Sequence, residues 1–150
     1  MKIALFPGSF DPVTKGHEDI IKRALLLFDK IYLAIGVNCS KEPLFPLETR
    51  KTWLLQCFGS ESRIEICTYE GLTVDLCKNV NAQFIIRGIR NANDFQFEKD
   101  IAQANKQVAP GIETVFFATA PEFSHINSTI VRDIYSNHGD YKQFIPDKLK

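Results

Sequence analysis

The sequence has 150 residues, and its 18 Lys and Arg balance 18 Asp and Glu, so its formal net charge is zero. This balance excludes the broad basic surface of a general nucleic-acid binder, and any positive field must be local. The length suits one domain with a hydrophobic core. No apolar run is long enough to cross a membrane and no N-terminal signal pattern is visible, which predicts a cytoplasmic protein.

The most informative segment is the turn Gly8–Pro12 together with the residues just after it. The turn follows the apolar run Ile3–Phe6, which predicts a strand over residues 2–6, and it precedes a helical pattern that starts near Glu18. A strand, a glycine-bearing turn and a helix N-terminus in this order form a site for an anion. His17, in the first helical turn, adds a hydrogen-bond donor. The turn residues also have a simpler structural use, and a lone histidine in a first turn is commonly solvated.

Strand-like and helix-like segments alternate along the rest of the chain. The strands are expected over residues 2–6, 30–37, 63–68, 83–87 and 113–118. Helical patterns cover residues 18–28, 46–57 with Pro46 in the first turn, 72–80 and 94–108, and a last helix opens at Asn127-Ser128-Thr129. Near-continuous apolar runs such as Ile31–Ile35 are typical of strands buried on both faces. Residues 1–150 are therefore predicted to form a single α/β domain, doubly wound and Rossmann-like, with a five-stranded parallel sheet flanked by helices.

Polar and cationic residues gather where the predicted strands end, which is where such sheets bind their ligands. They are Gly8, Ser9 and His17 after the first strand, Asn38, Ser40 and Lys41 after the second, Arg87, Gly88 and Arg90 at the fourth, and Phe123 and Ser124 after the fifth. This set predicts a crevice for a polyphosphate. Arg87 needs a partner, which is either a ligand or a carboxylate such as Asp94 or Glu98. Helix capping alone explains Asn127-Ser128-Thr129, with phosphate binding as an addition.

Several common sites are missing from the sequence. It has no G-x-x-x-x-G-K-S/T motif, which disfavours a P-loop NTPase, and no G-x-G-x-x-G after the first strand, which weakens a dinucleotide dehydrogenase. It also has neither G-x-S-x-G nor H-E-x-x-H. Cys39, Cys57, Cys67 and Cys77 have no C-x-x-C or zinc-ligand spacing, which predicts free thiols in a reducing compartment.

Two motifs carry a resemblance to a known family. Gly8–Pro12 with Thr14-x-Gly16-His17 resembles the (H/T)-x-G-H signature of the nucleotidyltransferase superfamily, and Ser124–Thr129 with Arg132 resembles its second signature. The likeness is closest to the bacterial phosphopantetheine adenylyltransferases. Further stretches that carry it are Ser40-Lys41-x-Pro43-x-Phe45, Leu47-Glu48-x-Arg50, Ile86–Arg90, Asp94-Phe95-x-Phe97-Glu98 and Ala104-Asn105. Asn127 departs from the usual Ser of the second signature, and Phe123 from the Trp or Tyr of many members.

The resemblance implies transfer of AMP from ATP to 4′-phosphopantetheine, giving dephospho-coenzyme A and pyrophosphate. It implies His17, Lys41 and Arg90 as catalytic residues. The ATP contacts that it implies are Ser9, Phe10, His17, Gly88, Ile89, Arg90, Glu98, Phe123, Ser124, His125, Ile126, Asn127, Ser128 and Thr129. The implied acceptor contacts are Ser9, Lys41, Leu72, Thr73, Arg87 and Asn105. Mg²⁺ is implied by ATP, with no protein ligands, as are a homohexamer and coenzyme A as an inhibitor, without nucleic-acid or membrane partners.

The roles that follow are mainly electrostatic. A phosphomonoester nucleophile needs no general base, so the residues have to align two anions and neutralise the charge that builds on the α-phosphoryl group. His17 would donate to that group, Lys41 and Arg87 would hold the incoming phosphate, and Arg90 would hold the leaving pyrophosphate. Two alternatives remain open: another adenylyl- or cytidylyltransferase with a different phosphorylated acceptor, and a non-catalytic nucleotide-binding module.

Overall fold

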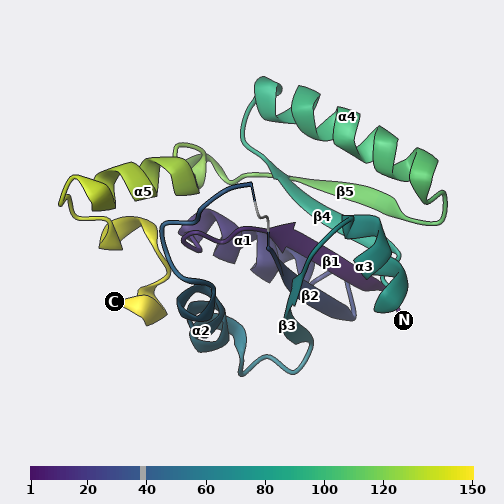
Figure 1. Cartoon of the computed structure of the whole chain (residues 1–150), viewed down its shortest axis with the longest axis horizontal. Helices are drawn as coiled ribbons and strands as arrows, with labels where there is room; N and C mark the ends of the chain where they lie inside the picture. The colour runs from purple at the N-terminus through teal and green to yellow at the C-terminus, as the bar shows by residue number, and fades with distance from the viewer. Residues whose placement is uncertain (38–39) are drawn as a thin grey trace.

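The computed structural model describes residues 1–37 and 40–150. In this part of the chain, five strands form one sheet with helices on both faces (Figure 1). The strands are β1 (Ile3–Gly8), β2 (Lys30–Gly36), β3 (Ile64–Tyr69), β4 (Phe84–Ile89) and β5 (Glu113–Ala118). The helices are α1 (Lys15–Ala24), α2 (Leu47–Phe58), α3 (Thr73–Asn79), α4 (Ala92–Val108) and α5 (Ser128–Ser136), with short 3₁₀ turns at Pro121–Phe123, Lys142–Phe144 and Asp147–Leu149.

The sheet is parallel throughout, with strand order β3-β2-β1-β4-β5. The chain winds outward from β1 to β3, crosses back, and winds outward again from β4 to β5. The strand order therefore reverses between β1 and β4, and a crevice is expected beyond the carboxyl ends of these two strands. This confirms the predicted doubly wound, Rossmann-like α/β class.

Apolar side chains on the two faces of the sheet form two core clusters. On one face, Phe6, Leu33 and Ile86 pack with residues of α1 and α2, and on the other face Leu5 and Ile85 pack with residues of α3. Burial on both faces explains why these strands read as continuous apolar runs in the sequence. A third cluster, which includes Ile126, Val131 and Ile145, seats the C-terminal segment on the body.

Several predicted element boundaries were wrong, and side-chain caps explain the helical ones. The first helix begins at Lys15 rather than near Glu18, because the Thr14 hydroxyl accepts from the His17 main chain. Helix α4 begins at Ala92 rather than 94, because the Asn91 side chain accepts from the main-chain N–H of Asp94. Pro46 is the N-cap of α2 rather than part of its first turn. Strands β1 and β4 each continue two residues further than predicted, to Gly8 and Ile89.

The described cysteines are free thiols, as predicted. Cys57 and Cys77 are buried, and burial raises the pKa of each thiol to about 11. Cys67 is half-buried, and burial raises its pKa as well. Asn38 and Cys39, which the sequence analysis names, lie outside the described residues. Within residues 1–37 and 40–150, none of the helices combines the length and the apolar character needed to span a bilayer.

Candidate active site

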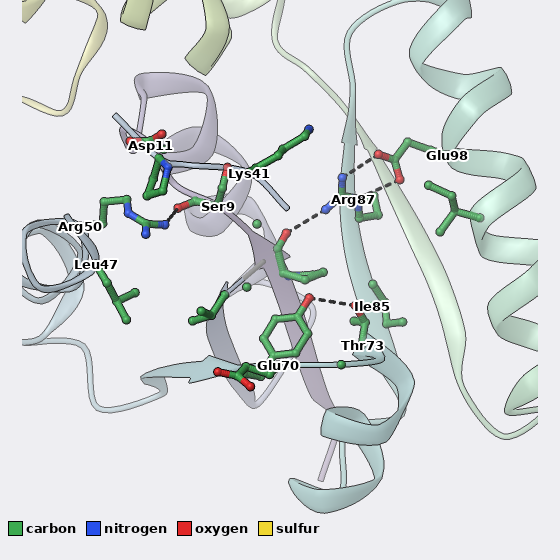
Figure 2. A pocket seen from close by; sticks show the side chains of 18 of the residues that line it. Ser9, Asp11, Lys41, Leu47, Arg50, Glu70, Thr73, Ile85, Arg87 and Glu98 are labelled. Atoms are coloured by element: carbon green, nitrogen blue, oxygen red, sulfur yellow. Dashed lines mark hydrogen bonds and ion pairs between the residues drawn. The ribbon is translucent and has the colours of Figure 1, made fainter. Parts of the chain in front are cut away.

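A cavity of about 1100 Å³ opens beside the carboxyl ends of β1 and β4 (Figure 2). It lies at the predicted crevice, and its walls come from the strand ends, the segment before α2, the start of α3 and one face of α4. Its lining includes Gly8, Ser9, Asp11, Lys41, Leu47, Arg50, Tyr69, Glu70, Thr73, Ile85, Arg87, Glu98, Ile101, Ala102, Asn105, Thr114 and Arg132. The predicted acceptor residues, except Leu72, are therefore gathered around one space.

The turn after β1 is held by packing as well as by hydrogen bonds. Phe10 has a φ of 46°, in the left-handed region that non-glycine residues seldom adopt. Its ring is buried and packs against Phe6 and His17, with ring centroids 5.7 and 5.0 Å apart. The Phe10 side chain thus belongs to the core, so any nucleotide contact from this residue comes from its main chain.

His17 has a defined tautomer. Its Nδ1 accepts a hydrogen bond of 3.0 Å from the main-chain N–H of Thr14, which leaves the proton of the neutral ring on Nε2. Burial, together with the positive charges of Arg87 and Arg90, lowers the pKa of His17 to about 4. His17 is therefore neutral near pH 7 and lies within electrostatic reach of both arginines. Its side chain is not part of the described cavity lining, to which the same loop contributes Gly8, Ser9 and Asp11.

Arg87 in β4 and Arg90 just after this strand both pair with carboxylates of α4. Arg87 donates to Glu98 through Nε at 2.8 Å and Nη2 at 2.6 Å, and its Nη1 donates to the Pro7 carbonyl at 2.8 Å. Arg90 donates to Asp94 through Nε at 3.0 Å and Nη2 at 3.2 Å. The partner of Arg87 is thus Glu98, one of the two carboxylates that the sequence suggested. Arg87 also lies within β4 rather than at its end.

Charge is more balanced in the cavity than the sequence suggested. Lys41, Arg50, Arg87 and Arg132 line it, and so do the carboxylates Asp11, Glu42, Glu70 and Glu98. Of these carboxylates, Glu98 is committed to Arg87, and Asp11 accepts from two main-chain N–H groups. Lys41 is exposed and forms no ion pair with a carboxylate of the described residues. It is therefore available to an anionic ligand.

Most of the predicted ATP residues lie around the cavity rather than in it. Among the described lining residues, the predicted ATP set contributes only Ser9 and Glu98, and Gly88, Ile89, Arg90 and residues 123–129 lie outside it. Ile126 is buried and Phe123 is half-buried in the third core cluster. Asn127 caps α5 by accepting from Ile130, which is the structural use that the sequence left open. Ser124, His125 and Thr129 are exposed.

Sequence reasoning missed several residues that line the cavity. Arg50 and Asp11 are buried beneath it, and Tyr69 donates to or accepts from the Thr73 hydroxyl at 2.9 Å. Arg132 donates to the Asp11 carbonyl at 2.9 Å and to the Thr129 hydroxyl at 3.0 Å. Arg50 and Arg132 stand inside the stretches that carry the family resemblance. Both are charged residues in helical segments that also carry apolar residues, and this pattern could have identified them as candidate site residues.

Comparison with known proteins gives a consistent assignment. The sequence model of the cytidylyltransferase-like family matches residues 5–134. A phosphopantetheine adenylyltransferase of Flavobacterium psychrophilum is 51% identical over 150 residues, covering 100% of this chain and 99% of the relative. The enzymes of the same name from Cytophaga hutchinsonii and Bacteroides thetaiotaomicron are 46% and 42% identical, and each match covers at least 99% of both chains.

Solved structures resemble this chain in fold. A bifunctional NMN adenylyltransferase/ADP ribose pyrophosphatase from Francisella tularensis superposes with a TM-score of 0.71 at 22% identity, covering 96% of this chain and 44% of that one. A putative nicotinate-nucleotide adenylyltransferase from Vibrio parahaemolyticus gives 0.68 at 19% identity, covering 99% and 96%. With the full-length relatives at 42–51% identity, the chain belongs to the phosphopantetheine adenylyltransferases, within the cytidylyltransferase-like family.

Proposed function

We propose that this protein transfers the adenylyl group of ATP to 4′-phosphopantetheine, giving dephospho-coenzyme A and pyrophosphate. The observation that carries the proposal is the convergence of Ser9, Lys41 and Arg87, from three separate segments, on one cavity. A hydroxyl and two cations are suitable donors for a phosphomonoester. The cavity also extends past Ile101, Ala102 and Asn105, where a long arm with apolar and amide groups would lie.

The acceptor phosphate would compete with a carboxylate for Arg87. Arg87 already has a bidentate partner in Glu98. A dianionic phosphate that approaches from the cavity would share the guanidinium with Glu98 or displace it, while Lys41 supplies a second positive charge. Thr73 and Asn105 would contact the arm, and the exposed Leu72 would lie at the mouth.

The chemical step needs alignment and charge neutralisation. An oxygen of the acceptor phosphate attacks the α-phosphorus of ATP, and the bond from that phosphorus to the β-bridging oxygen breaks in line. The Nε2 proton of the neutral His17 would be donated to a non-bridging α-phosphate oxygen as charge develops there. Arg90 and the N-terminus of α5, with Ser128 and Thr129, would hold the departing pyrophosphate. Gly88, Ile89, Glu98 and residues 123–127 complete the ATP contacts of the proposal.

Magnesium would enter the reaction with ATP. Mg²⁺ prefers phosphate oxygens and water over a dedicated set of protein ligands in nucleotide sites. The described residues contain no group of three or more His, Cys, Asp or Glu side chains that could hold a metal ion. We therefore assign the metal to the phosphate oxygens of the substrate and derive no step through it.

We further propose that residues 1–150 act as one nucleotidyltransferase domain in the cytoplasm, without nucleic-acid or membrane partners. The chain would assemble as a homohexamer, and coenzyme A, which shares the pantetheine arm, would compete for the cavity. Exposed apolar side chains on α4, among them Phe95, Phe97 and Val108, support an assembly because such a surface is otherwise costly in water.

The test is a panel of phosphorylated acceptors with ATP and Mg²⁺, followed by pyrophosphate release and by the product mass. The proposal expects turnover with 4′-phosphopantetheine at the expense of ATP and the mass of dephospho-coenzyme A. Preferential turnover of nicotinamide mononucleotide or a polyol phosphate would assign the chain to another acceptor, and turnover of CTP instead of ATP would change the transferred group. Nucleotide binding without turnover of any acceptor would make it a binding module.

A further inference from the structure

Two hydrogen bonds to Asp11 join the turn after β1 to the segment before α2, and two more from Arg50 of α2 connect to both. The Asp11 carboxylate accepts from the main-chain N–H groups of Leu44 and Phe45, both at 2.9 Å. Arg50 donates through Nε to the Phe45 carbonyl at 2.9 Å and through Nη1 to the Ser9 carbonyl at 2.7 Å. Asp11 thus links the two segments directly, and Arg50 bridges them from the first turns of α2; Figure 2 shows Arg50 directed at Ser9.

The two joined segments carry the groups assigned to the acceptor phosphate. Ser9 lies in the first segment, and Lys41 lies three residues before Leu44, with Pro43 between them. The Phe45 ring is anchored separately, packing against Trp53 at 4.8 Å and Tyr135 at 5.0 Å between ring centroids. The anchored Phe45 therefore fixes the end of the segment from which Lys41 extends.

Arg50 is an unusual residue to find at this place. It is only 5% exposed, and its hydrogen bonds within the described residues go to main-chain carbonyls. No ion pair joins it to a carboxylate in residues 1–37 or 40–150. A buried charge without a counter-charge is costly to a fold, so packing alone does not explain an arginine here. It also lines the cavity, where an anionic substrate would supply the missing negative charge.

We propose that Arg50 is a positioning residue for the transfer reaction. It sets the Ser9 turn and the Lys41 segment at the spacing at which both reach one acceptor phosphate, and its charge is balanced when that phosphate binds. A planar guanidinium donates from three nitrogens held in one rigid fork, whereas an ammonium group donates from a single nitrogen. The role rests on the proposed function, because it concerns the acceptor of that reaction.

The variants Arg50→Gln and Arg50→Lys test this role, with Arg63→Gln as the matched control. Arg63 is an exposed arginine that pairs with Glu61, away from the cavity. Steady-state kinetics with each substrate varied should show kcat/KM for the acceptor reduced by about 10²-fold in Arg50→Gln, the usual cost of misplaced groups. The KM for ATP should change less than threefold or so. Arg50→Lys should recover only part of the lost kcat/KM. Arg63→Gln should keep the wild-type kcat/KM for the acceptor.

A double substitution separates positioning from a general loss of structure. If Arg50 acts by placing Lys41, the loss caused by Arg50→Gln should shrink to about threefold or less in a Lys41→Ala background. The same loss in both backgrounds, or wild-type kcat/KM in Arg50→Gln, would overturn the proposal. Should Arg50→Gln fail to fold by circular dichroism, Arg50→Lys carries the test, and full activity in that variant would refute the need for the forked donor. Wild-type protein without any turnover would instead refute the proposed function.

Discussion

One nitrogen of His17 is free to act because Thr14 occupies the other. The Thr14 N–H donates to Nδ1 at 3.0 Å, so the capping of α1 and the tautomer of the ring are the same interaction. Burial and two nearby arginines keep the ring neutral, with its pKa lowered to about 4. A neutral imidazole that already carries its proton on Nε2 can donate to an oxyanion without any change of protonation at neutral pH.

Substitution of His17 tests this donor. His17→Ala should lower kcat by about 10² to 10³-fold, the typical cost of losing a transition-state donor, while the KM for ATP changes less. His17→Gln should retain part of the rate because its amide also donates. His138→Asn is the control, since His138 lies in a loop with a φ of 62°, a conformation that Asn tolerates. Near-wild-type turnover in His17→Ala would remove this residue from the chemistry.

The lowered pKa of His17 also predicts a pH dependence of stability. Because the folded-state pKa lies below the unfolded value of 6.5, the neutral ring favours the folded state above pH 6.5, and this contribution is lost as the pH falls toward 4. The difference in unfolding free energy between the wild type and His17→Gln should therefore shrink from pH 7 to pH 4.5. Urea denaturation at both values measures it, since the other titrating groups are common to both proteins. A difference that does not change with pH would contradict the shift.

Ionic contacts tie α4 to β4 and to the residue that follows it. Glu98 is the only buried residue of this helix in the described chain, and it is buried against Arg87 of β4. Asp94 makes the second link, to Arg90. The two arginines that the proposal assigns to phosphates, Arg87 and Arg90, therefore also pair with α4, and Figure 2 shows the Arg87–Glu98 pair.

A double-mutant cycle measures the tie between α4 and β4. Arg87→Gln and Glu98→Gln should each destabilise the protein, and the double variant should lose less than their sum, with a coupling of about 1–3 kcal/mol for a partly buried pair. Lys106→Gln with Glu113→Gln is the control, because that exposed pair should couple by no more than about 1 kcal/mol. Arg87→Gln should also raise the KM for the acceptor more than that for ATP. Additive effects at Arg87 and Glu98 would show that the pair does not hold the helix.

The order and type of the elements could be predicted because hydrophobic periodicity is a local property. The strand ends that the sequence marked, at Ser9, Lys41 and Arg87, do meet at one cavity because a parallel sheet brings its carboxyl ends together. The role of Arg50 could not be predicted, because its carbonyl partner in Ser9 is 41 residues away. The burial of the Phe10 ring was also hidden, since it depends on packing against His17 and Phe6.

For the whole molecule, the exposed apolar side chains of α4 predict assembly. Light scattering after size-exclusion chromatography should give about six times the mass of one chain, 17.1 kDa. Phe97, 67% exposed, is a suitable probe: Phe97→Glu should shift the protein to smaller species without lowering its helical content. Leu26→Glu is the control, because Leu26 is 83% exposed and lies outside α4. A monomeric wild type would contradict the proposed assembly.

The state of the cysteines has a consequence for an enzyme with this acceptor. 4′-Phosphopantetheine ends in a sulfhydryl, which attacks disulfides as its thiolate and, once it has been oxidised to a disulfide, is itself attacked by exposed thiolates. None of Cys57, Cys67 and Cys77 is part of the described cavity wall, and burial raises the pKa of all three. At these three positions the protein therefore offers almost no thiolate for exchange, so they would not trap the substrate as a mixed disulfide when the surroundings become oxidising.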